Sequence, residues 1–120
     1  SDFISLHLPL NENTHGILGY DEIHNIKVGA TLINTARGGL VDEPALIGAL
    51  RSGHLRGAGL DVFAEEPLAD DHPLLKLNNV ILSPHVAYNT PDAVKAIFEI
   101  TVRNICRYFD GEPINIVATP

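Results

Sequence analysis

The chain contains a single cysteine, Cys106, so no disulfide can form within it. Basic residues are also few: 8 Lys and Arg stand against 15 Asp and Glu, for a formal net charge of −7. Binding to nucleic acid or to an anionic membrane needs a basic surface, so this balance argues against both partners. No apolar run approaches transmembrane length, and no basic-then-apolar signal peptide is evident. We therefore expect a cytoplasmic protein.

Several catalytic and binding motifs are absent as well. The histidines show neither HExxH nor a related ligand spacing, so we expect no metal site. They are His7, His15, His24, His54, His72 and His85. There is no GxSxG nucleophile elbow, and Cys106 falls inside a predicted helix, at a structural position. Without a GxGxxG turn or a P-loop, this chain alone lacks a phosphate cradle.

What the chain does contain is enough apolar sequence for the core of one domain. It has 120 residues, of which 45% are hydrophobic and 19% charged, which argues against disorder. Its first residues, Ser1 and Asp2, lead at once into an apolar strand pattern. We expect the chain to begin inside a sheet and to be a fragment of a longer protein.

Strand and helix patterns alternate along the chain, which is typical of an α/β fold with a parallel sheet and helices outside it. The expected strands are residues 3–7, 30–34, 57–62 and 79–83, and the expected helices are 20–26, 42–52 and 90–109. The apolar run that ends at Ile33 predicts a strand covered on both faces. Thr90, Pro91 and Asp92 form a strong helix start, with a capping hydroxyl, a proline and an acid in order.

The stretch 32–43 organises the rest of the chain, because it predicts a buried strand, a glycine turn and a capped helix in succession. Gly38 and Gly39 lack Cβ atoms, so the backbone there can turn sharply or let another molecule approach. Asp42 is placed to cap the following helix. Arg37 therefore stands at the end of a strand, where an open α/β sheet binds ligands.

Chemically useful side chains follow the other predicted strands too. In a parallel sheet all carboxyl ends lie on one edge, so Arg37, Glu66 and His85 are expected to converge there. The Arg37 guanidinium suits a carboxylate, and His85 is the natural acid or base near neutral pH. Glu66 is the candidate to orient the imidazole of His85, and Asp61 can accept a hydrogen bond from an amide.

Each of these residues also has a purely structural interpretation. Arg37 can be an ordinary surface arginine, His85 a hydrogen-bonded loop histidine and Glu66 a solvated turn acid. Asp61 can cap the following turn, and Pro9 can simply end a strand. The functional interpretation rests on their coincidence at one edge of the sheet.

Four segments of the chain resemble the D-isomer-specific 2-hydroxyacid dehydrogenases, the group that includes D-lactate and D-3-phosphoglycerate dehydrogenases and glyoxylate/hydroxypyruvate reductases. The segments are SLHLPL at 5–10, INTARGGLVDE at 33–43, GAGLDVFAEEP at 57–67 and NVILSPH at 79–85. They occur in the family's order with near-family spacing, and the resemblance covers essentially the whole chain. It implies the parallel-sheet half of a Rossmann-like, doubly wound NAD-binding domain.

The resemblance also implies the activity and the parts that are missing. Residues 1–110 would be the second half of the cofactor domain, and residues 111–120 a tail leading towards an absent substrate domain. The parent would be a homodimer that interconverts a small 2-oxo acid and a D-2-hydroxy acid with NAD or NADP. The glycine-rich phosphate turn would lie upstream of residue 1, so we expect the isolated chain to be inactive.

Residue by residue, the resemblance implies three catalytic positions: Arg37 to bind the substrate carboxylate, Glu66 to support the histidine, and His85 as general acid/base. The implied cofactor contacts are Leu8, Pro9, Thr14, Thr35, Ala36, Arg37, Asp61, His85 and Ala87. Glu66 argues against the formate dehydrogenase branch, in which an amide replaces this acid. Two alternatives stay open: an NADH-sensing, corepressor-like binding module of the same fold, and an inactive structural fragment.

Overall fold

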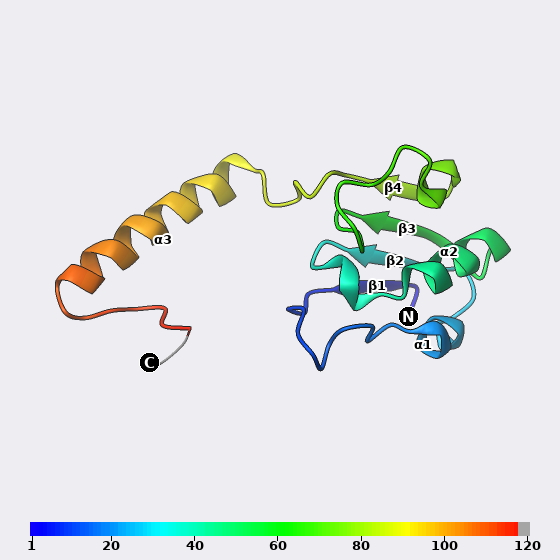
Figure 1. Cartoon of the computed structure of the whole chain (residues 1–120), viewed down its shortest axis with the longest axis horizontal. Coiled ribbons are helices and arrows are strands. Elements are labelled where there is room, and N and C mark those ends of the chain that lie inside the picture. Colours follow the sequence, from blue (N-terminus) through cyan, green and yellow to red (C-terminus); the bar gives the residue numbers. More distant parts are fainter. Residues whose placement is uncertain (118–120) are drawn as a thin grey trace. The chain divides into compact units, whose positions relative to one another are not determined.

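The computed structural model describes residues 1–117, and the chain divides into two compact units, Ser1–Ala87 and the segment that begins at Tyr88. The first unit contains the sheet, and the second contains one long helix (Figure 1). In the part of the chain that is described, no helix is both long and apolar enough to cross a membrane.

The sheet of the first unit has four strands, all parallel, in the order in which they occur along the chain (Figure 1). They are β1 (Phe3–Leu6), β2 (Ala30–Asn34), β3 (Leu55–Leu60) and β4 (Val80–Leu82). The predicted α/β class with a parallel sheet is therefore confirmed. The carboxyl ends of all four strands lie on one edge, which carries the candidate site.

One face of the sheet packs against α1 (Tyr20–Asn25) and α2 (Glu43–Ser52). A row of paired residues on that face, Leu6, Asn34, Leu60 and Leu82, crosses all four strands. Alternate residues point to the opposite face, where Ile33 is half-buried and Ile81 is 78% exposed. The second strand, predicted to be covered on both faces, is thus buried on one face and half-buried on the other in this unit, because an apolar run does not show which segments cover each face.

Helix α2 begins and ends where its sequence signals predict. The Asp42 carboxylate accepts a hydrogen bond from the backbone N–H of Ala45 at 2.9 Å, and Gly53 ends the helix with a φ of +75°. Leu46 and Leu50 are buried, and each such leucine contributes about 1.5–3 kcal/mol through removal of apolar surface from water. This capped helix fixes the position of Glu43, its first residue.

The strand β3 begins two residues earlier than the predicted 57–62 and ends at Leu60. Leu55 pairs with Ala30 and Gly57 with Thr31, so the register shifts at Arg56 of β3, and Gly29 donates its N–H to the carbonyl of His54. Pairing with the neighbouring strand thus extends β3 towards Gly53, which local sequence does not reveal. At its other end β3 stops at Leu60, so Asp61 lies just past the strand, where its side chain takes part in the site.

The second unit, considered alone, consists mainly of α3 (Pro91–Phe109). The Thr90 hydroxyl accepts a hydrogen bond from the N–H of Ala93 at 3.2 Å, so the predicted helix start is confirmed. No residue of α3 is buried in the described structure. After the helix, the Asn115 amide donates to the side-chain oxygen of Asn104 at 2.9 Å.

Candidate functional site

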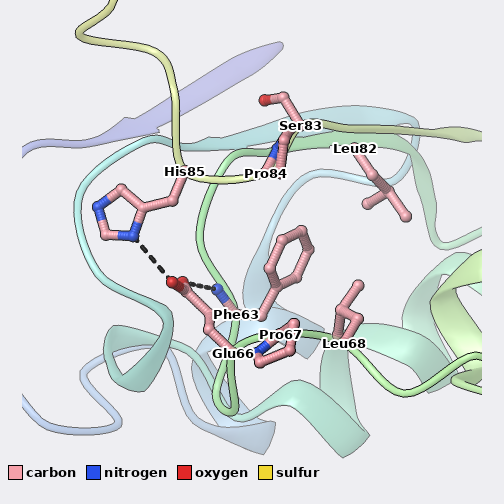
Figure 2. Close-up of a pocket in the computed structure, with 8 residues that line it drawn as sticks. All are labelled: Phe63, Glu66, Pro67, Leu68, Leu82, Ser83, Pro84 and His85. Atoms are coloured by element: carbon pink, nitrogen blue, oxygen red, sulfur yellow. Dashed lines mark hydrogen bonds and ion pairs between the residues drawn. The ribbon is translucent and has the colours of Figure 1, made fainter.

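The site is centred on His85 and Glu66, which come from the segments after β4 and β3. His85 Nδ1 lies 2.9 Å from Glu66 Oε2, and the two side chains are 44% and 36% exposed (Figure 2). Because an ionised carboxylate only accepts hydrogen bonds, Nδ1 carries the proton of this contact. The ring is thereby held with its other nitrogen, Nε2, on the side away from Phe63 and Leu68 (Figure 2). The predicted pairing of these two residues is present in the structure.

Glu66 is held by its own turn as well as by the histidine. Its Oε1 atom accepts the backbone N–H of Phe63 at 3.0 Å, and the Glu66–Pro67 peptide bond is cis. The hydrogen bond from His85, followed by that from Phe63, lowers the pKa of Glu66 below its usual range. The carboxylate is therefore ionised at neutral pH and accepts the Nδ1–H of the imidazole beside it.

Asp61 fixes the backbone that carries His85. Its side chain is 3% exposed, and its Oδ1 atom accepts the Ser83 hydroxyl at 2.6 Å and the N–H of Val86 at 2.9 Å, while Oδ2 accepts the N–H of Ala87 at 2.8 Å. Burial raises the pKa of Asp61, but these hydrogen bonds and the positive charge of His85 outweigh it and lower the pKa overall. The carboxylate thus remains charged inside the protein.

This support matters because His85 has a φ of +56°, in the left-handed region that non-glycine residues rarely adopt. Such a conformation costs about 1–3 kcal/mol and persists only where surrounding contacts hold it. Asp61 supplies those contacts, because its carboxylate accepts hydrogen bonds from Ser83, before the histidine, and from Val86 and Ala87, after it. Its predicted role as a direct cofactor contact stays a prediction.

Arg37 follows β2 in a turn that is organised by Asn34. The buried Asn34 side chain accepts the N–H of Ala36 at 3.0 Å and donates to the carbonyl of Arg37 at 2.9 Å. The exposed guanidinium donates only to the Ala36 carbonyl, at 2.6 Å, and no ion pair found among residues 1–117 involves it. Its charge is therefore available to an anionic ligand.

Gly38 brings the Arg37 turn against the Glu66 turn. A Cβ atom on Gly38 would lie 1.9 Å from the carbonyl oxygen of Phe63, so the two backbones touch at this point. The predicted residues Arg37, Glu66 and His85 thus lie on segments that are in mutual contact: Gly38 meets Phe63, Phe63 bonds Glu66, and Glu66 bonds His85.

Replacing Gly38 by alanine is expected to destabilise the fold, because the new methyl group would collide with backbone atoms that have no rotamer to change. We expect a loss of about 1–3 kcal/mol in the free energy of unfolding, measured by urea denaturation. Gly48 on α2 provides the control, since a Cβ atom there meets nothing within 4 Å. Equal stabilities for Gly38→Ala and Gly48→Ala would contradict the close contact.

A cavity of about 480 Å³ adjoins the histidine–glutamate pair. Its lining is mostly apolar and comprises Phe63, Glu66, Pro67, Leu68, Leu82, Ser83, Pro84 and His85 (Figure 2). The pair therefore stands at the polar border of an apolar hollow, an arrangement common in small-molecule sites.

A second cavity, of about 440 Å³, lies at the ends of β1 and β2 and is lined by His7, Leu8, Pro9, Thr35, Ala36 and Arg37. Five of these were predicted as cofactor contacts, so the fold gathers them in one hollow. Thr14 lies close by, since its hydroxyl donates to the Pro9 carbonyl at 2.6 Å. Asp61, His85 and Ala87 do not line this hollow. An exposed guanidinium beside apolar walls fits part of a dinucleotide.

Several residues that shape the site were missed by sequence reasoning. Asn34 and Ser83 act through buried hydrogen bonds, and a polar residue at the end of an apolar strand was the available signal for both. Glu43 and His72 form a second pair at 3.0 Å. They are 29 residues apart in sequence, so no local pattern joins them.

The fold and site define a parallel α/β domain with two cavities at the carboxyl edge of its sheet, where such domains bind ligands. The chain belongs to the D-isomer specific 2-hydroxyacid dehydrogenase family, whose NAD-binding domain model matches residues 1–87. The matched region coincides with the first compact unit.

Individual relatives agree with this membership. The chain is 45% identical over 118 residues to a glyoxylate reductase from Korarchaeum cryptofilum, covering 98% of this chain and 36% of the relative. An acyclic imino acid reductase solved with NADPH and D-arginine superposes with a TM-score of 0.92 at 39% identity, covering 98% of this chain and 38% of that one. D-lactate dehydrogenase with NAD+ from Lactobacillus jensenii superposes with a TM-score of 0.86 at 36% identity, covering 100% of this chain and 40% of that one. The chain thus spans about a third of the length of the curated relatives it matches.

Proposed function

We propose that this chain is part of an NAD(P)-dependent oxidoreductase that interconverts a 2-oxo acid and a D-2-hydroxy acid. In this proposal residues 1–110 form the second half of the NAD-binding domain, residues 111–120 lead towards a substrate domain, and the enzyme is a cytoplasmic homodimer. The chain alone would be inactive. The observation that carries the proposal is the His85–Glu66 pair, with the imidazole held through Nδ1 and its Nε2 atom turned away from the holding group.

His85 is the general acid/base of the proposed reaction. With Nδ1–H bonded to the Glu66 carboxylate, Nε2 is the nitrogen that exchanges a proton with the substrate oxygen. In reduction, protonated Nε2 gives its proton to the carbonyl oxygen as that oxygen gains negative charge, and in oxidation neutral Nε2 removes the hydroxyl proton. Glu66 keeps the ring orientation fixed through its hydrogen bond to Nδ1.

Arg37 holds the substrate carboxylate. Its planar guanidinium presents parallel N–H donors that match the two carboxylate oxygens, and no acidic side chain in the described residues competes for it. Two such bonds fix the 2-oxo acid in orientation as well as position, which aligns its carbonyl group with respect to His85. The hydrogen bonds made by the Asn34 side chain and the close contact at Gly38 fix the backbone from which the Arg37 side chain extends.

The cofactor would lie along the carboxyl edge of the sheet. The cavity at β1 and β2 is lined by Leu8, Pro9, Thr35, Ala36 and Arg37, and the exposed guanidinium on its wall, which suits an anionic ligand, supports their role. Thr14, Asp61, His85 and Ala87 complete the proposed contacts. When bound, NAD(P)H supplies the hydride for the substrate carbon.

The test is a panel of 2-oxo acids with NADH and NADPH, carried out on a full-length enzyme that contains this chain. We expect reduction of at least one acid, and we expect Arg37→Lys to raise KM for it about 10- to 100-fold, because a bidentate contact is lost. Arg51→Lys, on the exposed last turn of α2, is the matched control and should leave KM unchanged. No turnover of any acid, or binding of a partner peptide without turnover, would overturn the proposal.

A further inference from the structure

The turn that carries Glu66 is held from its other side by a second histidine–carboxylate pair, which the proposed reaction does not use. His72 Nε2 lies 3.0 Å from Glu43 Oε1, and these side chains are 20% and 17% exposed, less than either member of the His85–Glu66 pair. Glu43 is the first residue of α2, and His72 lies on the loop between β3 and β4. The pair therefore joins the loop to the first turn of α2, which is capped by Asp42.

Glu43 also binds the Glu66 turn directly. Its Oε2 atom accepts the backbone N–H of Ala64 at 3.3 Å, while the neighbouring N–H, that of Phe63, is accepted by Glu66. Two consecutive backbone donors thus go to two different carboxylates. The two N–H groups belong to adjacent peptide planes that share the Cα of Phe63, so a displacement of Phe63 would disturb both bonds together, and the position of Glu43 and the position of Glu66 are coupled.

The hydrogen bonds also assign the protons of His72. Its Nδ1 atom accepts the N–H of Leu74 at 3.3 Å, so the ring proton must reside on Nε2, where it is donated to Glu43. Both nitrogens are therefore occupied by the chain itself. His72 is not placed to exchange protons with a substrate.

We propose that Glu43 and His72 are positioning residues that hold the Phe63–Ala64 backbone, and through it the Glu66 carboxylate, in the orientation that meets His85. The inference rests on the proposed function in one respect only, the assignment of His85 and Glu66 as the acid/base pair. Neither Glu43 nor His72 touches the reacting atoms in this scheme. Their effect reaches the chemistry through the hydrogen bonds made by Glu66.

The pKa of the Glu66 carboxyl group reports this coupling, because the bonds from His85 and Phe63 are what lower it. We would follow the Glu66 side-chain ¹³C signal during a pH titration of the 120-residue chain. In Glu43→Gln the amide NH2 must face either Ala64 N–H or His72 Nε2–H, so one pair of donors repels and the turn shifts. We expect the pKa of Glu66 to rise towards its ordinary value.

The direction in which the pKa of Glu66 changes distinguishes a positioning role of Glu43 from the mere effect of its negative charge. Removing a negative charge near a carboxylic acid lowers its pKa, whereas loss of the aligned donors raises it. Glu65→Gln is the matched control, since Glu65 is exposed, adjoins Glu66 and makes no side-chain hydrogen bond found in residues 1–117. That variant should leave the pKa of Glu66 unchanged or slightly lower.

A second variant breaks the same pair from the histidine side, in case Glu43→Gln prevents the chain from folding. In His72→Asn the shorter side chain can still accept the N–H of Leu74 but cannot reach Glu43, so the cap is kept and the pair is broken. We expect a smaller rise in the pKa of Glu66. An unchanged or lowered pKa of Glu66 in both variants would overturn the proposal, as would unfolding of both, which would show that the pair supports the whole fold. Because the titration needs neither cofactor nor substrate, its result is independent of whether the enzyme assay succeeds.

Discussion

Replacing His85 by alanine is expected to lower kcat by about 10²- to 10⁴-fold, the usual contribution of a positioned general acid/base, in a full-length enzyme that contains this chain. The reason is that alanine removes the imidazole that is bonded to Glu66, so the substrate oxygen would have to exchange its proton with water. Steady-state kinetics with the preferred 2-oxo acid would measure the effect. KM should change far less, because Arg37 still holds the carboxylate.

Two further variants make this result specific. His24→Ala removes a histidine that stacks on Tyr20 in α1 and should leave kcat unchanged. Glu66→Gln keeps an oxygen that can accept the imidazole Nδ1–H but removes the negative charge beside the ring, so kcat should fall less than in His85→Ala. A kcat for His85→Ala within a factor of two of the parent value would exclude this histidine from the chemistry.

Asp61→Asn is expected to cost about 3 kcal/mol in the free energy of unfolding at neutral pH, because it leaves a buried donor facing another donor. The carboxylate accepts three hydrogen bonds at 2.6–2.9 Å from Ser83, Val86 and Ala87. An amide group offers one oxygen and one NH2 in the same space, so at least one backbone N–H loses its partner. Urea denaturation at pH 7 would measure the loss, with Asp70→Asn on the exposed loop as the control.

The same carboxylate predicts how stability depends on pH. The pKa of Asp61 and that of Glu66 are both lower in the folded chain than their ordinary values, so each stabilises the fold at pH values above the unfolded pKa of about 4. That stabilisation is lost as the pH falls below this value and through the lower folded pKa. Glu66 is 36% exposed, so solvent screening makes its share the smaller one.

Asp61→Asn should therefore lose less stability than the parent chain when the pH is lowered from 7 to 3. Parallel urea denaturation curves at the two pH values would measure this difference. A parent and variant with the same acid sensitivity would show that the stabilising charge lies elsewhere.

Local sequence signals predicted the elements whose ends are fixed by their own residues. Thr90 and Asp42 cap their helices as expected, and the glycine after α2 ends it. The rule that parallel strands end on one edge also predicted that His85 and Glu66 meet. Such features depend on short-range hydrogen bonds or on topology alone, and both are visible in a sequence.

Other features depend on contacts between distant segments and were not predictable in the same way. The start of β3 is set by its pairing with Ala30, and the exposure of Ile81 by which segments cover the sheet. The bond between Glu43 and His72 joins residues from separate elements. The same holds for Gly38, whose need for a small residue arises from the backbone of Phe63 rather than from its own turn.

The contacts that hold the histidine–glutamate pair are made largely to backbone atoms of the surrounding loops: the N–H of Phe63, and those of Val86 and Ala87. The apolar hollow beside the pair is built instead from the side chains of residues such as Leu68 and Leu82. The hydrogen bonds that hold the pair and the shape of the hollow are thus determined by different atoms of the same loops. Substitutions of these side chains can therefore reshape the hollow for a different ligand while the backbone contacts that orient His85 and Glu66 stay the same.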